Sequence, residues 1–496
     1  MENTYPAIVK DLDIHLNSVA SRLFGNRFLS DQTLYEYLIE FLLIFVSEKN
    51  NINDSGKMSF HNNTKERLEY YIEPRMGLRR FIFFDKARRN GIVQIDETAY
   101  KEIVYLLQNK IKYNSEKEEV VDGIKDLLHG YAVVIKNRNW CAQRLLPVCP
   151  EMLFCDAMPN NRNRKNYSWK NNQEQVDTTF DFDKRNFLAR GGELYYLHIL
   201  QALEKNERNR DILEKLLRHL LGNGKNKLSE ICNFIQNNWE NYSGVQKDDL
   251  TIKLSISFIP KDAYVECEEY ALEELINFLS SELPIINHIE LFAKGLMFQI
   301  LRMLCWRVNN YLGVENKWIV DMKGSSTDNI KKISAKSFRI IEDSFLTALN
   351  KIAREIGIED SEIMKKINDA KKSSLEILRA KGKELQCIIP TKGPNERFSL
   401  SVDIIRFLVL ALIPPTKKIT LNMFLDKIYT HYGIIIGPEE YRKYIDKVNG
   451  LDVSLANSFS ENLSAFQAFL KASGFLKELS DATSIVFNPY NNLLEA

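Results

Sequence analysis

The sequence predicts a mainly α, multi-domain helical protein, and three observations lead to this prediction. The chain has 496 residues, which is enough for more than one hydrophobic core. It contains only 21 glycines and 13 prolines, the residues that interrupt helices most strongly. Apolar side chains recur at helical spacing in most segments between the polar loops. Few breakers over such a length favour long helices over a turn-rich β architecture.

Residues 1–158 are expected to form an N-terminal helical domain. The segment 31–48 is predicted to be a helix, because Ser30 or Asp31 is a suitable N-cap and apolar residues follow at helical spacing. Helical patterning resumes over 66–71 and 96–110. Residues 131–135 form a short apolar run that is consistent with a strand or with a buried helical turn, and periodicity does not choose between the two.

A polar, basic loop is expected at 159–178, because residues 159–175 hold almost no aliphatic side chains. So long an irregular segment typically marks a functional loop, disorder or a domain boundary. A central helical bundle is expected over 179–390, with linkers at 322–334 and 388–397. Its helices are predicted at about 190–221, 227–239, 264–280, 287–311, 336–356 and 360–381. The helix at 287–311 is apolar on most sides, which is typical of the centre of a bundle.

The pattern changes in the C-terminal segment, residues 398–496. The predicted order is a helix at 402–412, a strand at 418–420, helices at 421–432 and 438–448, a helix at 461–472 capped by Ser460, and strands at 475–479 and 484–487. Helices and a strand followed by a two-stranded wing, in this order, resemble a winged-helix domain. This resemblance implies a C-terminal winged-helix-like domain whose last helix enters the DNA major groove or docks a protein.

Charge favours protein docking over DNA reading for this last helix. Residues 398–496 carry nine Lys and Arg against ten Asp and Glu, whereas a groove-reading helix needs cations around it to meet the phosphates. The expected solvent face of the helix carries a single cation, Lys471, and Asn462 and Gln467 are candidates for reading adenine edges. These three residues are the candidate nucleic-acid contacts of the segment.

Two basic clusters in the N-terminal part are further candidates for contacting DNA. Six Lys and Arg accompany one acid in 75–89, and seven accompany two acids in 136–170. Cations neutralise phosphates, and aromatic rings among them stack on exposed bases. The alternative interpretation is a solvated charged face beside a disordered loop. The candidate contacts are Arg79, Arg80, Lys86, Arg88, Arg89, Arg162, Arg164, Lys165 and Trp169.

No catalytic residue, cofactor or metal site is predicted. The glutamates between residues 263 and 274 recur at helical spacing, so a solvated helix face is expected for them. The histidines, including His288 and His431, stand apart from any zinc or nucleophile motif. No apolar run approaches the roughly 18 residues of a membrane span, and no secretory signal is visible at the N-terminus. A cytoplasmic protein without membrane contact is therefore expected.

The segments 138–140, 145–147 and 480–490 resemble parts of uncharacterised accessory proteins of prokaryotic DNA-modification-linked defence systems. With the basic clusters and the nearly neutral C-terminal segment, this resemblance predicts a non-catalytic DNA-binding or scaffold subunit of a prokaryotic DNA-handling or anti-phage defence complex. The expected partners are DNA and other protein subunits, such as an ATPase, a helicase or a nuclease. A winged-helix transcription regulator and an enzyme with a site invisible in one sequence are the alternatives.

Overall fold

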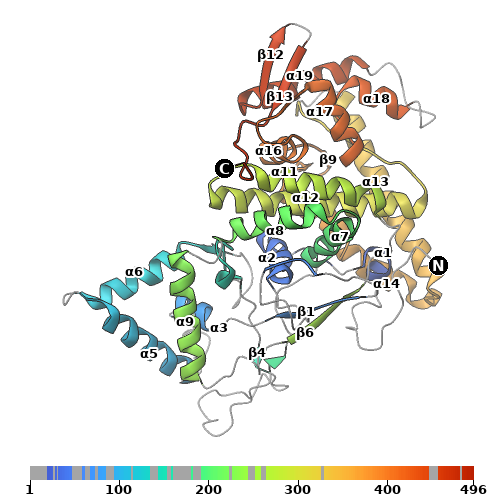
Figure 1. Ribbon diagram of the computed structural model, residues 1–496. Helices are drawn as coiled ribbons and strands as arrows, with labels where there is room; N and C mark the ends of the chain where they lie inside the picture. Colours follow the sequence, from blue (N-terminus) through green and yellow to red (C-terminus); the bar gives the residue numbers. More distant parts are fainter. Residues whose placement is uncertain are drawn as a thin grey trace.

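The computed structural model describes residues 19–25, 28, 30, 32–46, 58–61, 67–72, 76–84, 94–112, 116–134, 143–153, 158–159, 180–181, 191–222, 226–243, 252–257, 264–324, 329–445, 456–480 and 483–495. These residues form a mainly helical protein, as the sequence predicts. The helices build a central body, an arm that projects from it, and a C-terminal segment that lies on the opposite side of the body (Figure 1).

Two consecutive helices form the centre of the body, α11 (Val265–Ser280) and α12 (Ile285–Leu312). Apolar side chains surround α12, so it is buried along most of its length, and it ends at Gly313, whose left-handed φ of 68° suits a glycine C-cap. Helices α7 (Gly191–Lys205) and α8 (Arg208–Leu220) pack on one side of this pair, and α16 (Val402–Leu412) packs on the other (Figure 1). None of the helices in the described part of the chain is long and apolar enough to cross a membrane.

Three further helices, α1 (Val19–Phe24), α13 (Asn329–Glu355) and α15 (Leu375–Glu384), contact α12, and α14 (Asp360–Lys372) packs on all three of them. Helix α13 packs along α12 and contacts α1, and α14 and α15 follow it. The helix expected at 360–381 is therefore two helices with a break after residue 372. The linker expected at 322–334 is shorter than predicted, because α13 already begins at Asn329.

Helix α2 (Leu34–Phe45) belongs to the body, although it lies far from α7 in the sequence. The Thr33 side chain caps its N-terminus in a capping box with Glu36. The Glu40 carboxylate accepts a hydrogen bond from the Gly192 N–H at 2.8 Å. A Cβ atom at Gly192 would lie 2.0 Å from the backbone oxygen of Tyr37, so this close approach of α2 and α7 requires a glycine.

The arm combines helices from both sides of the boundary expected near residues 159–178. It consists of α3 (Met76–Ile82), α5 (Gln94–Lys110), α6 (Lys117–His129) and α9 (Lys227–Ser243) (Figure 1). Helix α9 packs against both α3 and α5. A Cβ atom at Gly77 would lie 2.5 Å from the Trp239 side chain, so this contact is close. The expected boundary itself falls largely outside the described residues and stays a prediction.

The helix predicted at 66–71 is wrong. Residues Arg67–Ile72 form strand β1, which pairs antiparallel with β6 (Ile252–Ser257). Six residues are too few for periodicity to separate a helix from a strand, and pairing with a distant segment decides the conformation. The open choice at 131–135 also resolves as a strand, since β2 (Ala132–Val134) pairs with β3 (Gln143–Leu145). The 3-10 helix Pro150–Met152 and the short pair β4 (Met158–Pro159) and β5 (Phe180–Asp181) follow.

The C-terminal segment begins with the short hairpin β8 (Ile388–Ile389) and β9 (Arg397–Phe398), followed by α16. Its other elements are β10 (Lys418–Thr420), α17 (Leu421–Lys427), the π-helix Ile428–Tyr432, β11 (Ile434–Ile435), α18 (Pro438–Ile445), α19 (Ala456–Ala472), β12 (Leu476–Ser480) and β13 (Thr483–Phe487). Strands β10, β13 and β12 form an antiparallel sheet in this order.

This segment shares its hydrophobic core with the body. The ring of Phe407 in α16 lies 5.4 Å from that of Phe278 in α11. It also fills the space that Gly295 leaves on α12, because a Cβ atom there would lie 2.2 Å from the ring. Strand β11 pairs in parallel with β7 (Trp318–Ile319) of the body. The C-terminal segment is therefore anchored to the body by both apolar packing and backbone pairing.

Candidate functional site

Most of the predicted DNA contacts lie outside the described residues. Arg79 and Arg80 belong to helix α3, but only the backbone of these two residues is described. The remaining N-terminal candidates fall outside the described ranges, namely Lys86, Arg88, Arg89, Arg162, Arg164, Lys165 and Trp169. The convergence of the two basic clusters on one surface therefore stays a prediction.

The predicted exposure of Asn462 is wrong. Its side chain is fully buried, and its Nδ2 donates hydrogen bonds to the backbone oxygens of Val320 and Ile436, each at 2.9 Å. Its Oδ1 accepts a hydrogen bond from the Met322 N–H at 2.8 Å. Both amide hydrogens and the amide oxygen are thus used inside the protein. Asn462 holds α19 against the β7–β11 pair and does not face a DNA base.

The other two candidates on α19 do not form a cationic surface either. Gln467 is half-buried, and the exposed Lys471 forms an ion pair with Glu478 of β12 at 2.8 Å. Near the beginning of the helix, Glu461 pairs with Lys323 at 2.5 Å. The other exposed positions of α19 carry four small side chains, Ser460, Ser464, Ala468 and Ala472, and one aromatic ring, Phe469. This face has little capacity to attract phosphates.

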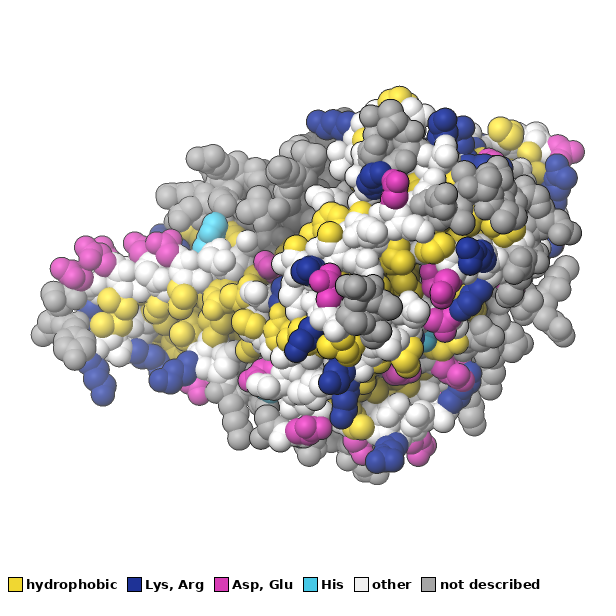
Figure 2. Space-filling view, turned by 90° about the horizontal axis from the view of Figure 1, so that it is seen from above, with side chains coloured by type: hydrophobic (Ala, Val, Ile, Leu, Met, Phe, Trp, Pro, Cys, Tyr) yellow, Lys and Arg dark blue, Asp and Glu magenta, His cyan; other side chains and the backbone are white. Residues whose placement is uncertain are grey.

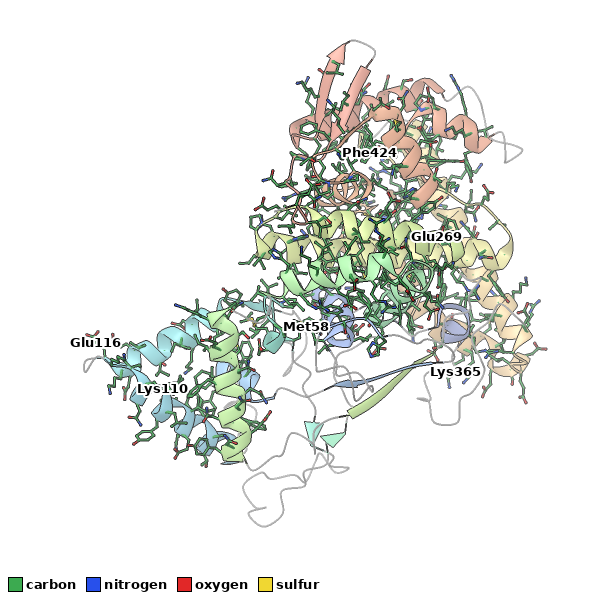
Figure 3. The ribbon with its side chains drawn as sticks, viewed as in Figure 1. Met58, Lys110, Glu116, Glu269, Lys365 and Phe424 are labelled. Carbon is green, nitrogen blue, oxygen red and sulfur yellow. The ribbon has the colours of Figure 1, made fainter. Side chains whose placement is uncertain are left out.

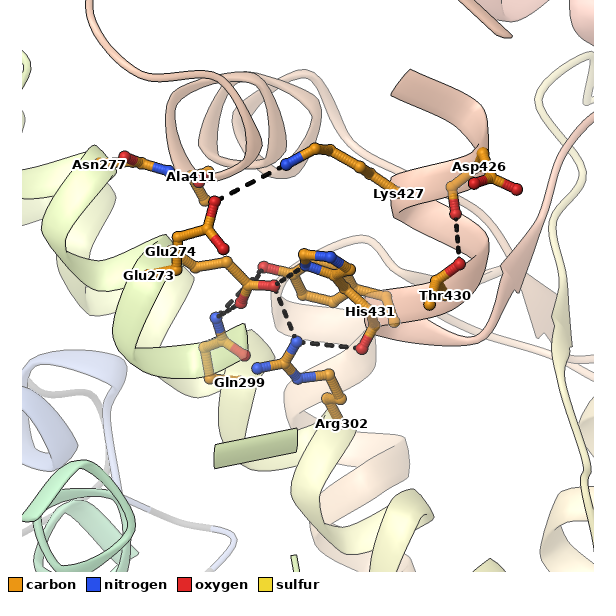
Figure 4. Close-up of polar contacts among 11 residues, drawn as sticks. Glu273, Glu274, Asn277, Gln299, Arg302, Ala411, Asp426, Lys427, Thr430 and His431 are labelled. Carbon is orange, nitrogen blue, oxygen red and sulfur yellow. Dashed lines mark hydrogen bonds and ion pairs between the residues drawn. The ribbon is translucent and has the colours of Figure 1, made fainter. Parts of the chain in front are cut away.

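A buried carboxylate, Glu274, lies where α11, α12 and the π-helix meet (Figure 4). Its Oε1 accepts hydrogen bonds from Arg302 Nη1 at 3.1 Å and from His431 Nδ1 at 2.9 Å. Its Oε2 accepts from Gln299 Nε2 at 2.6 Å and from the Tyr432 hydroxyl at 2.8 Å. Because a carboxylate accepts about four hydrogen bonds, these donors occupy it completely.

Three local features bring these groups together. Glu274 shares a face of α11 with the apolar residues Ala271 and Phe278, so this face turns inward. Gln299 and Arg302 are three residues apart on α12 and therefore lie on one face. The wide turn of the π-helix presents the consecutive residues His431 and Tyr432 to the same carboxylate.

Arg302 and the rings around it complete the cluster. Arg302 Nη1 also donates to the backbone oxygen of His431 at 3.0 Å, and its guanidinium lies 4.4 Å from the centre of the Tyr432 ring. The Tyr270 ring stacks on His431 at 3.8 Å. Every element of the junction is therefore held by at least one polar and one ring contact.

Electrostatics keep this cluster ionised. Burial alone would raise the pKa of the Glu274 carboxyl, but the Arg302 charge and the hydrogen bonds from His431 and Gln299 together hold the pKa below its ordinary value. Burial and the same carboxylate raise the pKa of the Tyr432 hydroxyl. A carboxylate with a lowered pKa and four internal donors is suited to holding elements together and is a poor general base.

This cluster is not predicted by the sequence, because the helical spacing of the glutamates in 263–274 favours a solvated face for all of them. That prediction is correct for Glu269, which is labelled in Figure 3, and for Glu273, because their side chains are 64% and 55% exposed. It is wrong for Glu274 and for Glu268, which is buried and pairs with Lys205. The available signal was the position of Glu274 between apolar residues three before and four after it.

A second buried polar group, His198 of α7, makes stability depend on pH. Its ring is fully buried, 5.3 Å from the ring of Tyr264, and burial lowers its pKa from 6.5 to about 3. The unfolded chain therefore binds this proton more readily than the folded protein. Above pH 6.5 this histidine does not reduce the free energy of unfolding. As the pH falls from 6.5 towards 3, its protonation in the unfolded chain lowers the free energy of unfolding by about 1.4 kcal/mol per pH unit.

Between pH 7 and pH 5, we expect the free energy of unfolding to fall by about 2 kcal/mol less in His198→Phe than in the unaltered chain. The measurement is the free energy of unfolding in urea at both pH values. His219→Phe is the matched control, because His219 is exposed on the next helix. An unchanged difference between pH 7 and pH 5 in His198→Phe would show that His198 does not titrate in this way.

No group of three or more His, Cys, Asp or Glu side chains within the described ranges is arranged to hold a metal ion. Comparisons of the chain with protein-family models, with curated proteins and with solved structures gave no match.

Proposed function

We propose that this chain is a non-catalytic scaffold subunit of a prokaryotic DNA-handling or anti-phage defence complex. In this proposal the N-terminal basic clusters contact DNA, and the C-terminal segment docks another protein subunit. The observation that carries the proposal is the surface of α19. Its polar candidate Asn462 is buried, Lys471 is paired within the chain, and its outer face is small and nearly neutral.

The winged-helix-like fold of the C-terminal segment is part of this proposal. A winged-helix-like C-terminus is supported by α16, β10, α17, α19, β12 and β13, which follow in this order with α18 as an extra helix between α17 and α19, and by a sheet in which β10 pairs with β13 and β13 with β12. In a DNA-reading winged helix, the helix before the wing faces the groove. A protein-docking role agrees better with the outer face of α19, whose charges are balanced by ion pairs.

The Glu274 cluster supports the proposal that the subunit is non-catalytic. It is a buried group of ionised side chains, the kind of arrangement that often marks an active site. Here the carboxylate is fully occupied by donors of the same chain, and each of its four donors lies on α12 or the π-helix. The cluster therefore supports a structural role at the junction that carries the C-terminal segment.

Titration of a fluorescent 30-base-pair duplex with variants of the full chain tests the proposal. We expect Arg79/Arg80/Arg88/Arg89→Ala and Arg162/Arg164/Lys165→Ala each to weaken DNA binding by about tenfold or more, because each removes several phosphate contacts. Gln467/Lys471→Ala on α19 is the matched control and should bind within twofold of the unaltered chain.

The outcomes separate the candidate functions. Unchanged binding in both N-terminal variants would overturn the assignment of DNA contacts to the basic clusters. Loss of binding in the α19 variant alone would favour a winged-helix transcription regulator instead. Both results remain interpretable as binding effects, because none of the substituted residues is Glu274 or one of its four hydrogen-bond donors.

A further inference from the structure

The arm carries an exposed apolar stripe on helix α6. Val120 and Leu127 are 44% and 53% exposed, and the half-buried Ile124 lies between them with Gly123. These four residues follow the spacing i, i+3, i+4 and i+7, so they form one continuous face of the helix. The buried face of α6 is formed by Val121 and Leu128. Helix α6 thus carries exposed apolar side chains beside its buried face: Ile124 packs partly against the core, whereas Val120 and Leu127 stay largely exposed.

Gly123 differs from the other helical glycines that the structure describes. A Cβ atom at Gly77, Gly191, Gly192, Gly295 or Gly382 would lie within 2.5 Å of another part of the protein, so internal packing requires each of these glycines. A Cβ atom at Gly123 would meet nothing within 4 Å. Glycine weakens a helix interior relative to alanine. The missing side chain at Gly123 therefore leaves room for something outside this chain.

Acidic residues border the stripe. Glu119, Asp122 and Asp126 are exposed and occur at i, i+3 and i+7, so they form a row alongside Val120 and Leu127. Lys125 offsets part of this charge, because its ammonium group lies 3.6 Å from Asp122 Oδ1, but its side chain is only 14% exposed and also donates to the Tyr100 hydroxyl of α5 at 2.7 Å. Figure 2 shows apolar side chains along the arm, with acidic side chains on one edge and basic ones on the other. Figure 3 places Glu116 at the outer end of the arm.

We propose that this face of α6 binds an amphipathic α-helix of a partner protein, with Gly123 at the point of closest approach and basic residues of the partner opposite Glu119, Asp122 and Asp126. A glycine between apolar side chains lets the backbones of two helices approach closely, and this geometry suits a partner helix better than a loop. The acidic row disfavours DNA and anionic membranes, which carry phosphates. The inference rests on residues of α6 alone, so it does not depend on the proposed function.

Two designed helical peptides test the inference with the full chain. Both carry leucines at i, i+3, i+4 and i+7, and the other positions are lysine in one peptide and glutamate in the other. We expect the unaltered chain to bind the lysine peptide at least about tenfold more tightly, with a preference that weakens as salt is raised. Gly123→Gln should reduce binding of the lysine peptide about tenfold, because its side chain blocks the approach at the centre of the face.

The variants are chosen so that unfolding does not mimic the result. Gly123→Gln replaces glycine by a better helix former in open space, so its melting temperature should not fall. Glu119→Lys/Asp126→Lys should abolish the preference for the lysine peptide. The matched control is Glu362→Lys, since Glu362 is exposed on α14, outside the arm, and should leave the preference unchanged. Equal binding of both peptides, or undiminished binding by Gly123→Gln, would overturn the proposal. Self-association of the chain that Gly123→Gln abolishes would assign the face to a second copy instead.

Discussion

Replacing Glu274 by alanine is expected to lower the free energy of unfolding by about 3–5 kcal/mol, because it leaves the buried Arg302 charge without its partner. The side chains of Glu274 and Arg302 are 1% and 4% exposed, so solvent does not compensate for the loss. The substitution also removes the acceptor that holds His431 and Tyr432 of the π-helix. Urea unfolding of the full chain at pH 7 measures the effect.

A double variant separates the charge effect from the loss of packing. Glu274→Leu/Arg302→Met removes both charges and keeps the apolar volume, so it should be less destabilised than Glu274→Ala. The neighbouring Glu273→Ala is the matched control, because Glu273 is half exposed, and it should change the free energy of unfolding by about 0.5 kcal/mol or less. A cost for Glu274→Ala as small as this control would show that the cluster does not hold the junction.

The second large effect is expected for Phe41→Ala in helix α2, at about 3–5 kcal/mol. The Phe41 ring is fully buried, and its centre lies 5.6 Å from the rings of Tyr195 and Tyr196 in α7 and 5.9 Å from Phe292 in α12. The substitution opens a cavity where three helices meet and removes their aromatic contacts. Thermal and urea unfolding measure the effect.

Phe469→Ala is the control for Phe41→Ala, because Phe469 of α19 is 38% exposed and should cost far less. A loss of under 1 kcal/mol for Phe41→Ala would contradict the assignment of α2 to the core of the body. The comparison matters for domain organisation, since α2 and α7 lie on opposite sides of the boundary expected at 159–178.

The sequence was most informative where local signals are strong. The bounds of α16 and β10 were predicted correctly, because Ser401 caps the helix, Pro414 and Pro415 follow its end, and apolar spacing is regular between them. The central helix α12 was predicted within two residues, since no breaker interrupts its long apolar pattern. Helix propensity, capping residues and helix breakers depend only on residues close in the chain, so a single sequence is enough to identify them.

The sequence was least informative where distant residues decide the outcome. Strand β1 forms because β6, far along the chain, pairs with it. Asn462 is buried because the backbone groups of Val320, Met322 and Ile436 meet its amide. The hydrogen-bond donors of Glu274 lie on α12 and the π-helix. Because they are far from Glu274 in the sequence, no local pattern predicts these contacts. The segment of β1 was wrongly predicted as a helix, and Asn462 and Glu274 were correctly placed on helices but wrongly predicted to face solvent. In each case tertiary contacts determined the outcome.

Photo-cross-linking of a duplex DNA carrying reactive bases and phosphates to the full chain, followed by mapping of the linked peptides, tests the central functional claim most directly. The proposed function predicts cross-links within residues 75–89 and 136–170. Cross-links confined to α19 and the β12–β13 hairpin would contradict it, because they would place DNA on the segment to which we assign protein docking.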